Sequence, residues 1–386
     1  MTHPVTLANW QLPPNNARTF HRLREVVPTA RVAGSLTPAP LPPGAGLDLD
    51  LPVPLHDGLT GTVRSVLEGT NTDGFMVLHD GQVRAELYFG DYHAGQPHML
   101  FSVSKSVVSC VAGVLVEQGV LSPKSLVTEY VPELAGSGYD GATVRDILDM
   151  RSGVVFSENY LDPSAEVRLL EQVIGWAPRT DPSLSASMYE YLTTLRASRP
   201  HGGVFEYRSC ETNVLGWVCE RAAGERMPEL ISRVLWSRFA GTDMDAGVDL
   251  AGAVMHDGGL AATLRDTARF GELLLRGGQI AGEQLVPGWW IEDALTGAPD
   301  SRDVFAASPT DTRLPGGMYR NQFWVPYPDR RVLLCLGIHG QMIFIDYDHN
   351  TVVVKLSAWP YPQDAAMLLN TLSAASTIGP ALQTGS

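Results

Sequence analysis

Ser102 and Lys105 are spaced so that they could carry out nucleophilic chemistry together. They belong to the tetrapeptide Ser102-Val103-Ser104-Lys105, and residues three apart on a helix share one face, which places the amine beside the hydroxyl. A free lysine is protonated at neutral pH, but burial and the positive end of a helix both disfavour the ammonium form. We therefore expect Lys105 to have a lowered pKa and to take the serine proton as a general base.

The tetrapeptide alone is a weak signal. With only three lysines in the chain, a chance Ser-x-x-Lys arises roughly one time in five. Lys105 could equally extend its charged end out of an apolar helix, and Ser104 and Ser106 could be ordinary residues of a helix start. The chain has 25 arginines, however, and these supply most of its surface cations. A lysine is therefore less expected to be an ordinary exposed residue in this chain than in most proteins.

Two further motifs could complete such a site. In Tyr207-Arg208-Ser209, a tyrosine hydroxyl held between serine and lysine could carry a proton to a leaving group. The run Gly337-Ile338-His339-Gly340-Gln341 lies between two strand-like segments, where a backbone N–H could stabilise an oxyanion and glycines would allow close backbone approach. Each motif also has an ordinary interpretation, as a half-buried tyrosine or as a glycine hairpin with a core histidine.

The elements that must position these motifs follow from the pattern of apolar residues. Alternation on both sides of Asp80-Gly81 predicts a hairpin over 74–89. The apolar stretch from Ser102 predicts a buried helix closed by Gly119, and the segment 143–247 is predicted to be mostly helical. Three strand-like runs come next, VLLCLGI, MIFIDYD and TVVVKLS, and a last helix is expected over 364–378.

This order of elements predicts an α/β fold with an antiparallel sheet flanked by helices and an inserted all-helical domain. Strands from both ends of the chain would meet in the sheet. We expect a loop-rich N-terminal extension over 1–60, the α/β domain over 61–140 and 258–386, and the mainly helical insertion over 141–257. Clefts between such domains are the usual place for small-molecule sites.

Composition excludes several classes of function. The net charge of -14 argues against nucleic acid as a partner, because phosphate binding needs clustered lysine and arginine, and it would repel an anionic membrane surface. We find no secretory signal and no run of 18 apolar residues, so we expect no membrane span. The four cysteines form no C-x-x-C pair and suggest no metal site, which favours a reduced, cytoplasmic protein.

Together the three motifs resemble the serine β-lactamase and DD-peptidase superfamily, from about residue 60 to 375. The stretch 141–153 resembles the family's helix before the tyrosine domain, and 257–278 is typical of its class C and esterase branch. A closer similarity is to the 6-aminohexanoate-dimer hydrolases, the nylon-oligomer hydrolases, which stand near the family VIII carboxylesterases. The segments that carry this similarity are FSVSKS, VTEYVPELAGSGYDG, NYLDPSAEV, YEYLTTLR, FEYRS, GIHGQ and VVVKLSAWP.

The resemblance implies a β-lactamase-like fold and a role for individual residues. Ser102 would be the nucleophile, Lys105 the base and Tyr207 the proton relay, with the backbone N–H groups of Ser102 and Ile338 as the oxyanion hole. Tyr160 matches a tyrosine on a loop that closes over substrate and can donate to the amide nitrogen. The other residues expected to bind substrate are Glu171, Trp176, Asp257, Trp324 and His339. No metal or organic cofactor is implied, and family analogy allows a homodimer.

Departures from the family pattern keep several functions open. The segment CLGIHGQ has no lysine where penicillin-recognising members carry Lys-Thr-Gly, which weakens a β-lactamase or DD-peptidase interpretation. Glu171 stands where efficient nylon-oligomer hydrolases have aspartate, and Asp257 where they have asparagine. The first hypothesis is an amidase for linear 6-aminohexanoate oligomers with side activity on short esters. The second is a carboxylesterase with little amidase activity, and the third is a non-catalytic protein of the same fold.

Overall fold

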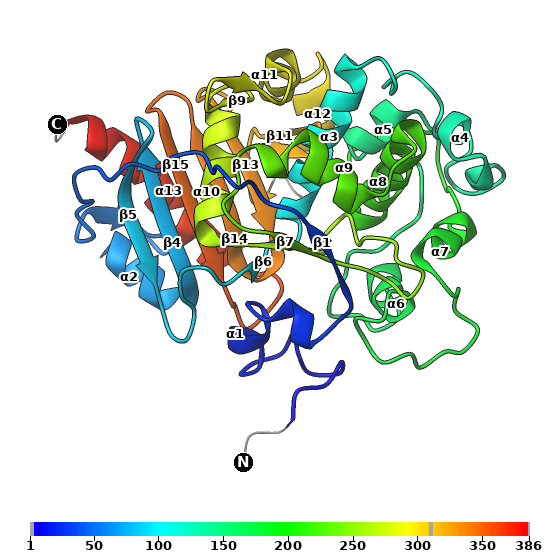
Figure 1. Ribbon diagram of the computed structural model, residues 1–386, viewed down its shortest axis with the longest axis horizontal. Coiled ribbons are helices and arrows are strands. Elements are labelled where there is room, and N and C mark those ends of the chain that lie inside the picture. Colours follow the sequence, from blue (N-terminus) through cyan, green and yellow to red (C-terminus); the bar gives the residue numbers. More distant parts are fainter. Residues whose placement is uncertain (1–3, 309–311, 385–386) are drawn as a thin grey trace.

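The computed structural model describes residues 4–308 and 312–384, and its centre is a seven-stranded antiparallel sheet (Figure 1). The strands lie in the order β11-β12-β13-β14-β15-β4-β5. Their bounds are Met318–Arg320, Phe323–Val325, Val332–Gly337, Gln341–Asp346, Thr351–Ser357, Thr72–His79 and Gln82–Tyr88. The predicted hairpin over 74–89 is confirmed, since β4 and β5 pair across Asp80 and Gly81, both of which have positive φ.

Pairing of β15 with β4 joins the two ends of the chain in this sheet, as predicted. Val353 lies opposite Val77, and the two strands are antiparallel. Alternate side chains of each strand enter different cores, because successive residues of a strand point to opposite faces. Val352 and Val354 of β15 pack in one core, while Val353 packs in the other.

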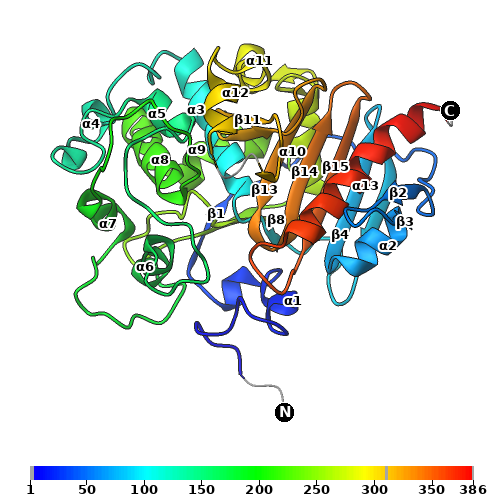
Figure 2. The same cartoon turned by 180° about the vertical axis from the view of Figure 1, so that it is seen from behind.

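A helix covers each face of the sheet. On one face, α10 (Leu264–Leu275) packs on β14, β15 and β4. On the other, α13 (Ala365–Thr384) crosses the strands and contacts α2 (Val63–Gly69), as Figure 2 shows from behind. The predicted last helix is thus confirmed but is longer than expected. Among the described residues, α13 is the one helix long and apolar enough to cross a membrane, yet it lies on the sheet as a core helix does.

A second, four-stranded sheet lies beside the first in the order β1-β7-β8-β6. Its strands span Thr29–Val32, Met244–Gly247, Leu260–Ala262 and His98–Met99. The sequence prediction missed this sheet because its strands are short, and β7 lies inside the segment expected to be all helical. Two small ribbons complete the strands, β2 (Pro52–Pro54) with β3 (Thr60–Thr62) and β9 (Gln279–Ile280) with β10 (Glu283–Gln284).

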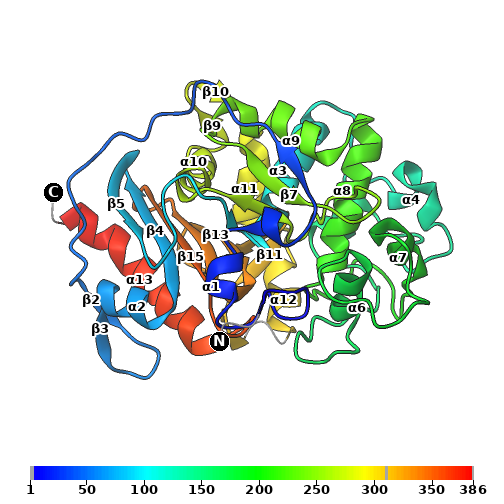
Figure 3. The ribbon, with the colours of Figure 1, turned by 60° about the horizontal axis from the view of Figure 1, so that its bottom comes forward.

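The N-terminal segment wraps the molecule rather than forming a unit of its own. It contains α1 (Asn16–Thr19), the 3-10 helix η1 (Leu23–Glu25) and β1. After β1 the chain runs past β10 and around β5 to reach β2, as Figure 3 shows. Trp10 and Phe20 are fully buried, so this loop-rich extension contributes to the core.

Most of the remaining helices gather on one side of the sheets (Figure 1). Their bounds are α4 Val127–Tyr130, α5 Val144–Leu148, α6 Glu166–Val173, α7 Met188–Thr194, α8 Ser209–Ala223 and α9 Met227–Val234, with η2 Pro132–Leu134 and η3 Trp236–Arg238. Thr143 caps α5, and Gly224, in the left-handed region, ends α8. The buried helix α3 (Val103–Glu117) runs between this group and the sheet, and contacts α8 and β13.

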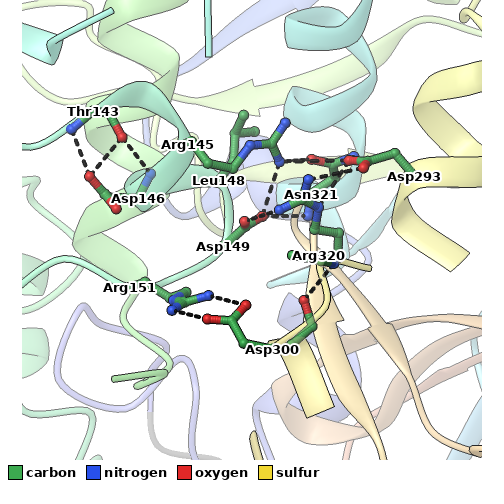
Figure 4. Close-up of polar contacts among 12 residues, drawn as sticks. Thr143, Arg145, Asp146, Leu148, Asp149, Arg151, Asp293, Asp300, Arg320 and Asn321 are labelled. Atoms are coloured by element: carbon green, nitrogen blue, oxygen red, sulfur yellow. Dashed lines mark hydrogen bonds and ion pairs between the residues drawn. The ribbon is translucent and has the colours of Figure 1, made fainter. Parts of the chain in front are cut away.

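A buried polar cluster ties the helical group to the sheet (Figure 4). Asp149, which follows α5, binds Arg320 at the end of β11, and Arg320 also binds Asp293 in α11 (Gly288–Thr296) at 2.9 Å. Asn321 is the centre of this cluster, since its side chain accepts a hydrogen bond from Arg145 and donates one to Asp293. Nearby, Arg151 binds Asp300, which precedes α12 (Ser301–Ala306).

Candidate active site

Ser102 lies at the first turn of α3, where the chain leaves an unusual backbone conformation. The preceding residue, Phe101, has a φ of 44°, a left-handed value that a bulky residue rarely adopts. Its ring is held by Phe20, 4.9 Å away between ring centroids. Strain of this kind persists where the surrounding structure fixes it, and it is common at functional sites. The turn brings Ser102 to the wall of a cavity while α3 itself is buried.

Lys105 is buried and directs its amine to three oxygen atoms. Its Nζ lies 3.0 Å from Ser102 Oγ, 3.2 Å from Ser209 Oγ and 2.8 Å from the backbone carbonyl of Asp257. Residues 102 and 105 therefore meet as their spacing on one helix face requires.

The pKa of Lys105 differs from our expectation, because it is raised rather than lowered. Burial is the largest influence and lowers this pKa, but the nearby oxygens of Tyr207, Asp257 and Glu158 raise it by more. The carboxylate of Asp257 is 3.8 Å from Nζ. The sequence reasoning counted burial and the helix terminus but had no means of placing these acidic groups. Lys105 therefore holds its proton at neutral pH when no substrate is bound.

Tyr207 stands between the other two residues and is stacked on Trp324. The two rings are 5.0 Å apart between centroids, and Lys105 Nζ lies 5.2 Å from the Tyr207 ring. Burial raises the pKa of Tyr207, while the charge of Lys105 and a hydrogen bond with Ser102 oppose this rise. The structure thus brings Ser102, Lys105 and Tyr207 together from α3 and from the start of α8.

The cavity beside Ser102 has a volume of about 340 Å³ and a mainly apolar wall. It lies between the helical group, the end of β13 and the start of α13. Five of the residues expected to act on substrate line it, namely Ser102, Tyr160, Tyr207, Trp324 and Ile338. The apolar residues that line it in addition include Phe156, Phe205, Leu314, Leu336, Met342, Trp359 and Leu368.

The turn after β13 approaches Ser102 closely. A Cβ on Gly337 would lie 2.6 Å from the carbonyl oxygen of Leu100, so only glycine lets this strand come so near the Ser102 turn. Gly340, with a φ of 88°, likewise lies against the ring of Trp359. Ile338, in the turn η5 (Ile338–Gly340), lines the cavity, which is where an oxyanion donor would have to be.

Glu158 is a member of the site that the sequence reasoning missed. Its carboxylate accepts hydrogen bonds from the backbone N–H of Ser209 and from the Tyr160 hydroxyl, the latter at 2.7 Å. Burial raises the pKa of Glu158, and the charge of Lys105 partly offsets this effect. The only signal in the sequence was an acidic residue two positions before Tyr160, which is unremarkable in a surface loop.

Four of the expected substrate-binding residues do not line the cavity. Glu171 is buried in α6 against Arg168, 2.6 Å away, and burial raises its pKa to about 7. Trp176 packs against Trp10, whose indole donates to its carbonyl at 2.8 Å. His339 lies behind the cavity wall, where burial lowers its pKa to about 4 and its Nδ1 is 2.8 Å from the Trp359 carbonyl. Asp257 contacts Lys105 but is likewise not part of the wall.

The described residues contain no candidate metal centre. Within 4–308 and 312–384, no group of three or more histidine, cysteine, aspartate or glutamate side chains could hold a metal ion. The four cysteines are buried and unpaired.

Comparisons with known proteins agree with this geometry. The family described as Beta-lactamase matches residues 59–376. A 6-aminohexanoate-dimer hydrolase of Paenarthrobacter ureafaciens is 39% identical over 358 residues, which is 92% of this chain and 89% of the relative. A solved structure of a candidate 6-aminohexanoate-dimer hydrolase from Bacillus anthracis superposes with a TM-score of 0.90 at 25% identity, over 99% of each chain.

A family VIII carboxylesterase superposes with a TM-score of 0.61 at 15% identity, over 81% of this chain and 95% of its own, which shows a likeness of fold alone. The predicted β-lactamase-like fold and the resemblance to 6-aminohexanoate-dimer hydrolases are both confirmed. The family match and the relative each span most of the chain. The chain therefore belongs to the beta-lactamase family and is a hydrolase of that fold.

Proposed function

We propose that this protein hydrolyses the amide bond of linear 6-aminohexanoate oligomers, such as the dimer, through an acyl-enzyme on Ser102. The observation that supports it best is the contact of Ser102 Oγ with Lys105 Nζ at 3.0 Å, beside a cavity that Tyr207 also lines. The relative with 39% identity is named for this substrate. Short acyl esters would be cleaved by the same groups.

The first half of the reaction acylates Ser102. Once Lys105 has lost its proton, its amine takes the proton of Ser102 as the serine oxygen attacks the amide carbon. The backbone N–H groups of Ser102 and Ile338 then stabilise the oxyanion. As the C–N bond breaks, the leaving nitrogen receives the proton of Tyr207, and Lys105 returns a proton to the phenol. The amine departs and the acyl group remains on the serine.

The second half of the reaction releases the acid. A water molecule gives a proton to the neutral Lys105 amine as its oxygen attacks the acyl carbon. The same two N–H groups stabilise the second oxyanion, and Ser102 leaves with the proton that Lys105 holds. One water molecule is consumed for each amide bond that is cleaved.

Tyr160 would assist the leaving amine from the other side of the cavity. Its hydroxyl is bound to Glu158 in this structure, 2.7 Å from the carboxylate. Binding of an amide would compete with Glu158 for that hydroxyl. This arrangement gives Glu158 the role of a holding group that keeps Tyr160 at the cavity wall.

The test compares the wild type with Ser102→Ala, using the linear 6-aminohexanoate dimer and p-nitrophenyl acetate. Wild type should hydrolyse both, and intact mass spectrometry should detect an acyl adduct during ester turnover. The variant should lose both activities and also fail to react with a fluorophosphonate probe. Full hydrolysis by Ser102→Ala would refute the proposal, and a wild type that neither turns over nor labels would favour a non-catalytic protein of this fold.

A carboxylesterase with little amidase activity is the second candidate function. The observation that favours it is the position of Glu171, whose carboxylate is paired with Arg168 and does not line the cavity, so it offers no direct partner to a substrate ammonium group. Tyr160→Phe discriminates between the two. Loss of amide turnover with ester turnover retained supports the amidase. Absence of amide turnover in the wild type supports the esterase, whereas turnover of nitrocefin would favour a β-lactamase.

Localisation, oligomeric state and domain division are further expected properties of the enzyme. We expect a cytoplasmic protein and a homodimer, which light scattering after gel filtration would test. We also propose the three-part division into 1–60, 61–140 with 258–386, and 141–257. Limited proteolysis that releases 141–257 as a stable unit would support that division.

A further inference from the structure

The turn that carries Ile338 has a conformation that needs support. His339 has a φ of 59° and Gly340 a φ of 88°, so two successive residues are left-handed. For a residue with a side chain this form is disfavoured relative to the right-handed form. The ring of His339 is fixed by Trp359, and its backbone N–H donates to the Pro362 carbonyl at 2.9 Å. These contacts hold the turn at His339.

Gln341 also holds this turn. It is the first residue of β14, its side chain is buried, and its Nε2 lies 2.7 Å from the carbonyl oxygen of Ser357. The same nitrogen is 3.1 Å from the His339 carbonyl and 3.3 Å from the Ile338 carbonyl. A side-chain amide nitrogen has two N–H bonds. One therefore donates to Ser357, and the other is shared between the two carbonyls of the turn.

The amide is itself fixed in orientation. Its Oε1 accepts a hydrogen bond from the backbone N–H of Ser357 at 3.0 Å, so both ends of the amide are bound to one residue of β15. Ser357 is fully buried. The Gln341 side chain thus joins the backbone of β15 to the turn, and it cannot rotate without breaking buried hydrogen bonds.

We propose that Gln341 is a positioning residue that sets the direction of the Ile338 N–H toward the oxyanion. The backbone of Gln341 pairs with Gly337, the residue before Ile338, and its side chain binds the Ile338 carbonyl. The peptide groups on both sides of Ile338 are therefore held by one residue. This inference rests on the proposed function, since it assumes that the reaction passes through an oxyanion on a Ser102 adduct.

The experiment uses the full-length protein with Gln341→Met, which keeps the length of the side chain and removes its amide. Gln322→Met is the matched control. Gln322 is equally buried and donates to the backbone carbonyls of Ile147 and Leu148, but it holds a different turn. The measurements are kcat and KM for p-nitrophenyl acetate, the inhibition constant of phenylboronic acid, which forms a tetrahedral anionic adduct with an active serine, and the melting temperature.

For Gln341→Met we expect kcat to fall about 10- to 100-fold, because removal of one oxyanion donor lowers kcat by about 10²–10³ and misalignment should do less. KM should change by less than about threefold, and phenylboronic acid should bind more weakly by a factor similar to the loss in kcat. Gln322→Met should lower the melting temperature and leave both kcat and boronate affinity within about twofold of the wild type.

Gln341→Asn, which keeps the amide but is one methylene too short, covers the case in which the methionine variant does not fold. An unchanged kcat and boronate affinity in whichever Gln341 variant folds would overturn the inference, provided that Ser102→Ala is inactive. If Ser102→Ala remains active, the proposed function fails as well, and the two failures are thereby told apart. A lower melting temperature with unchanged kcat and boronate affinity, as expected for Gln322→Met, would also overturn the inference.

Discussion

Replacement of Asp257 by asparagine should move the pH dependence of the enzyme. The carboxylate lies 3.8 Å from Lys105 Nζ, and both side chains are buried. Asparagine has nearly the same shape and keeps the backbone carbonyl that accepts a hydrogen bond from Lys105 at 2.8 Å. The variant therefore removes one negative charge from the surroundings of the amine and changes little else. Without that charge the ammonium form is less stable, and the amine loses its proton at a lower pH.

The distance sets the size of the effect. Two unit charges about 4 Å apart interact by about 4 kcal/mol at the effective dielectric constant of about 20 that describes protein sites. One unit of pKa corresponds to about 1.4 kcal/mol, so the upper limit of the shift is about three units. Tyr207 and Glu158 continue to raise the pKa of Lys105 in the variant. We expect the rising limb of kcat/KM to move downward by about one to three pH units.

The assay measures kcat/KM for p-nitrophenyl acetate from about pH 5.5 to about 11, so that it reaches the region in which Lys105 loses its proton, with Ser102→Ala as the blank for spontaneous hydrolysis. In the wild type, activity should rise with pH as Lys105 loses its proton, because only the neutral amine can accept the proton of serine. Asp245→Asn is the control, since Asp245 is equally buried but pairs with Arg24. A limb that stays in place in Asp257→Asn, or that moves equally in the control, would refute the reasoning.

Three further predictions concern other parts of the structure. Gly337→Ala should lower kcat about 10- to 100-fold, because its Cβ would lie 2.6 Å from the Leu100 carbonyl oxygen and β13 would have to move away from the Ser102 turn. An unchanged rate with p-nitrophenyl acetate would contradict this. Burial lowers the pKa of Lys355 from 10.5 to about 7. The folded protein therefore loses this proton at a lower pH than the unfolded chain, and the free energy of unfolding of the wild type should increase as pH rises from about 7 to 10.5. Urea unfolding of Lys355→Met at about pH 7 and about pH 9.5 should lack that increase. Asn321→Ala should reduce the free energy of unfolding by about 1–3 kcal/mol, because it removes the buried amide that hydrogen-bonds to both Arg145 and Asp293. An unchanged melting temperature by calorimetry would contradict this.

Local pattern was enough to predict the central elements of the fold. The hairpin β4–β5, the buried helix α3 and the strands β13 to β15 all have long apolar or alternating runs with clear ends. Those runs determine which face of each element is buried, and they carry the information in consecutive residues. The pairing of β4 with β15 followed once both were identified as strands of one sheet.

The second sheet could not be predicted in the same way. Strand β6 has only two residues and β8 has three, which is too few to show a period. These strands exist because β1, β7 and β8 supply hydrogen-bond partners to one another from distant parts of the chain. Tertiary context of this kind overrides local preference.

The site shows the same division between local and distant information. The contact of Ser102 with Lys105 follows from spacing on one helix. The raised pKa of Lys105 does not, because it depends on Asp257 and Glu158, which come from two other loops. The pairing of Glu171 with Arg168 is local, since the two are three residues apart on α6. That Glu171 does not line the cavity depends on how α6 packs, which its alignment with a family aspartate does not reveal.

The pairing of β4 with β15 also determines when a newly made chain can become active. Ser102 leaves the ribosome more than 200 residues before Ile338, and β4 must wait still longer for its neighbour in the sheet. During that time the edge of β4 and one face of α3 are uncovered, and such surfaces favour aggregation and chaperone binding. A chain stopped before residue 338 would contain the proposed nucleophile but would lack the Ile338 N–H, the second of the two proposed oxyanion donors. Synthesis of residues 338–357 therefore acts as the step that completes the proposed site.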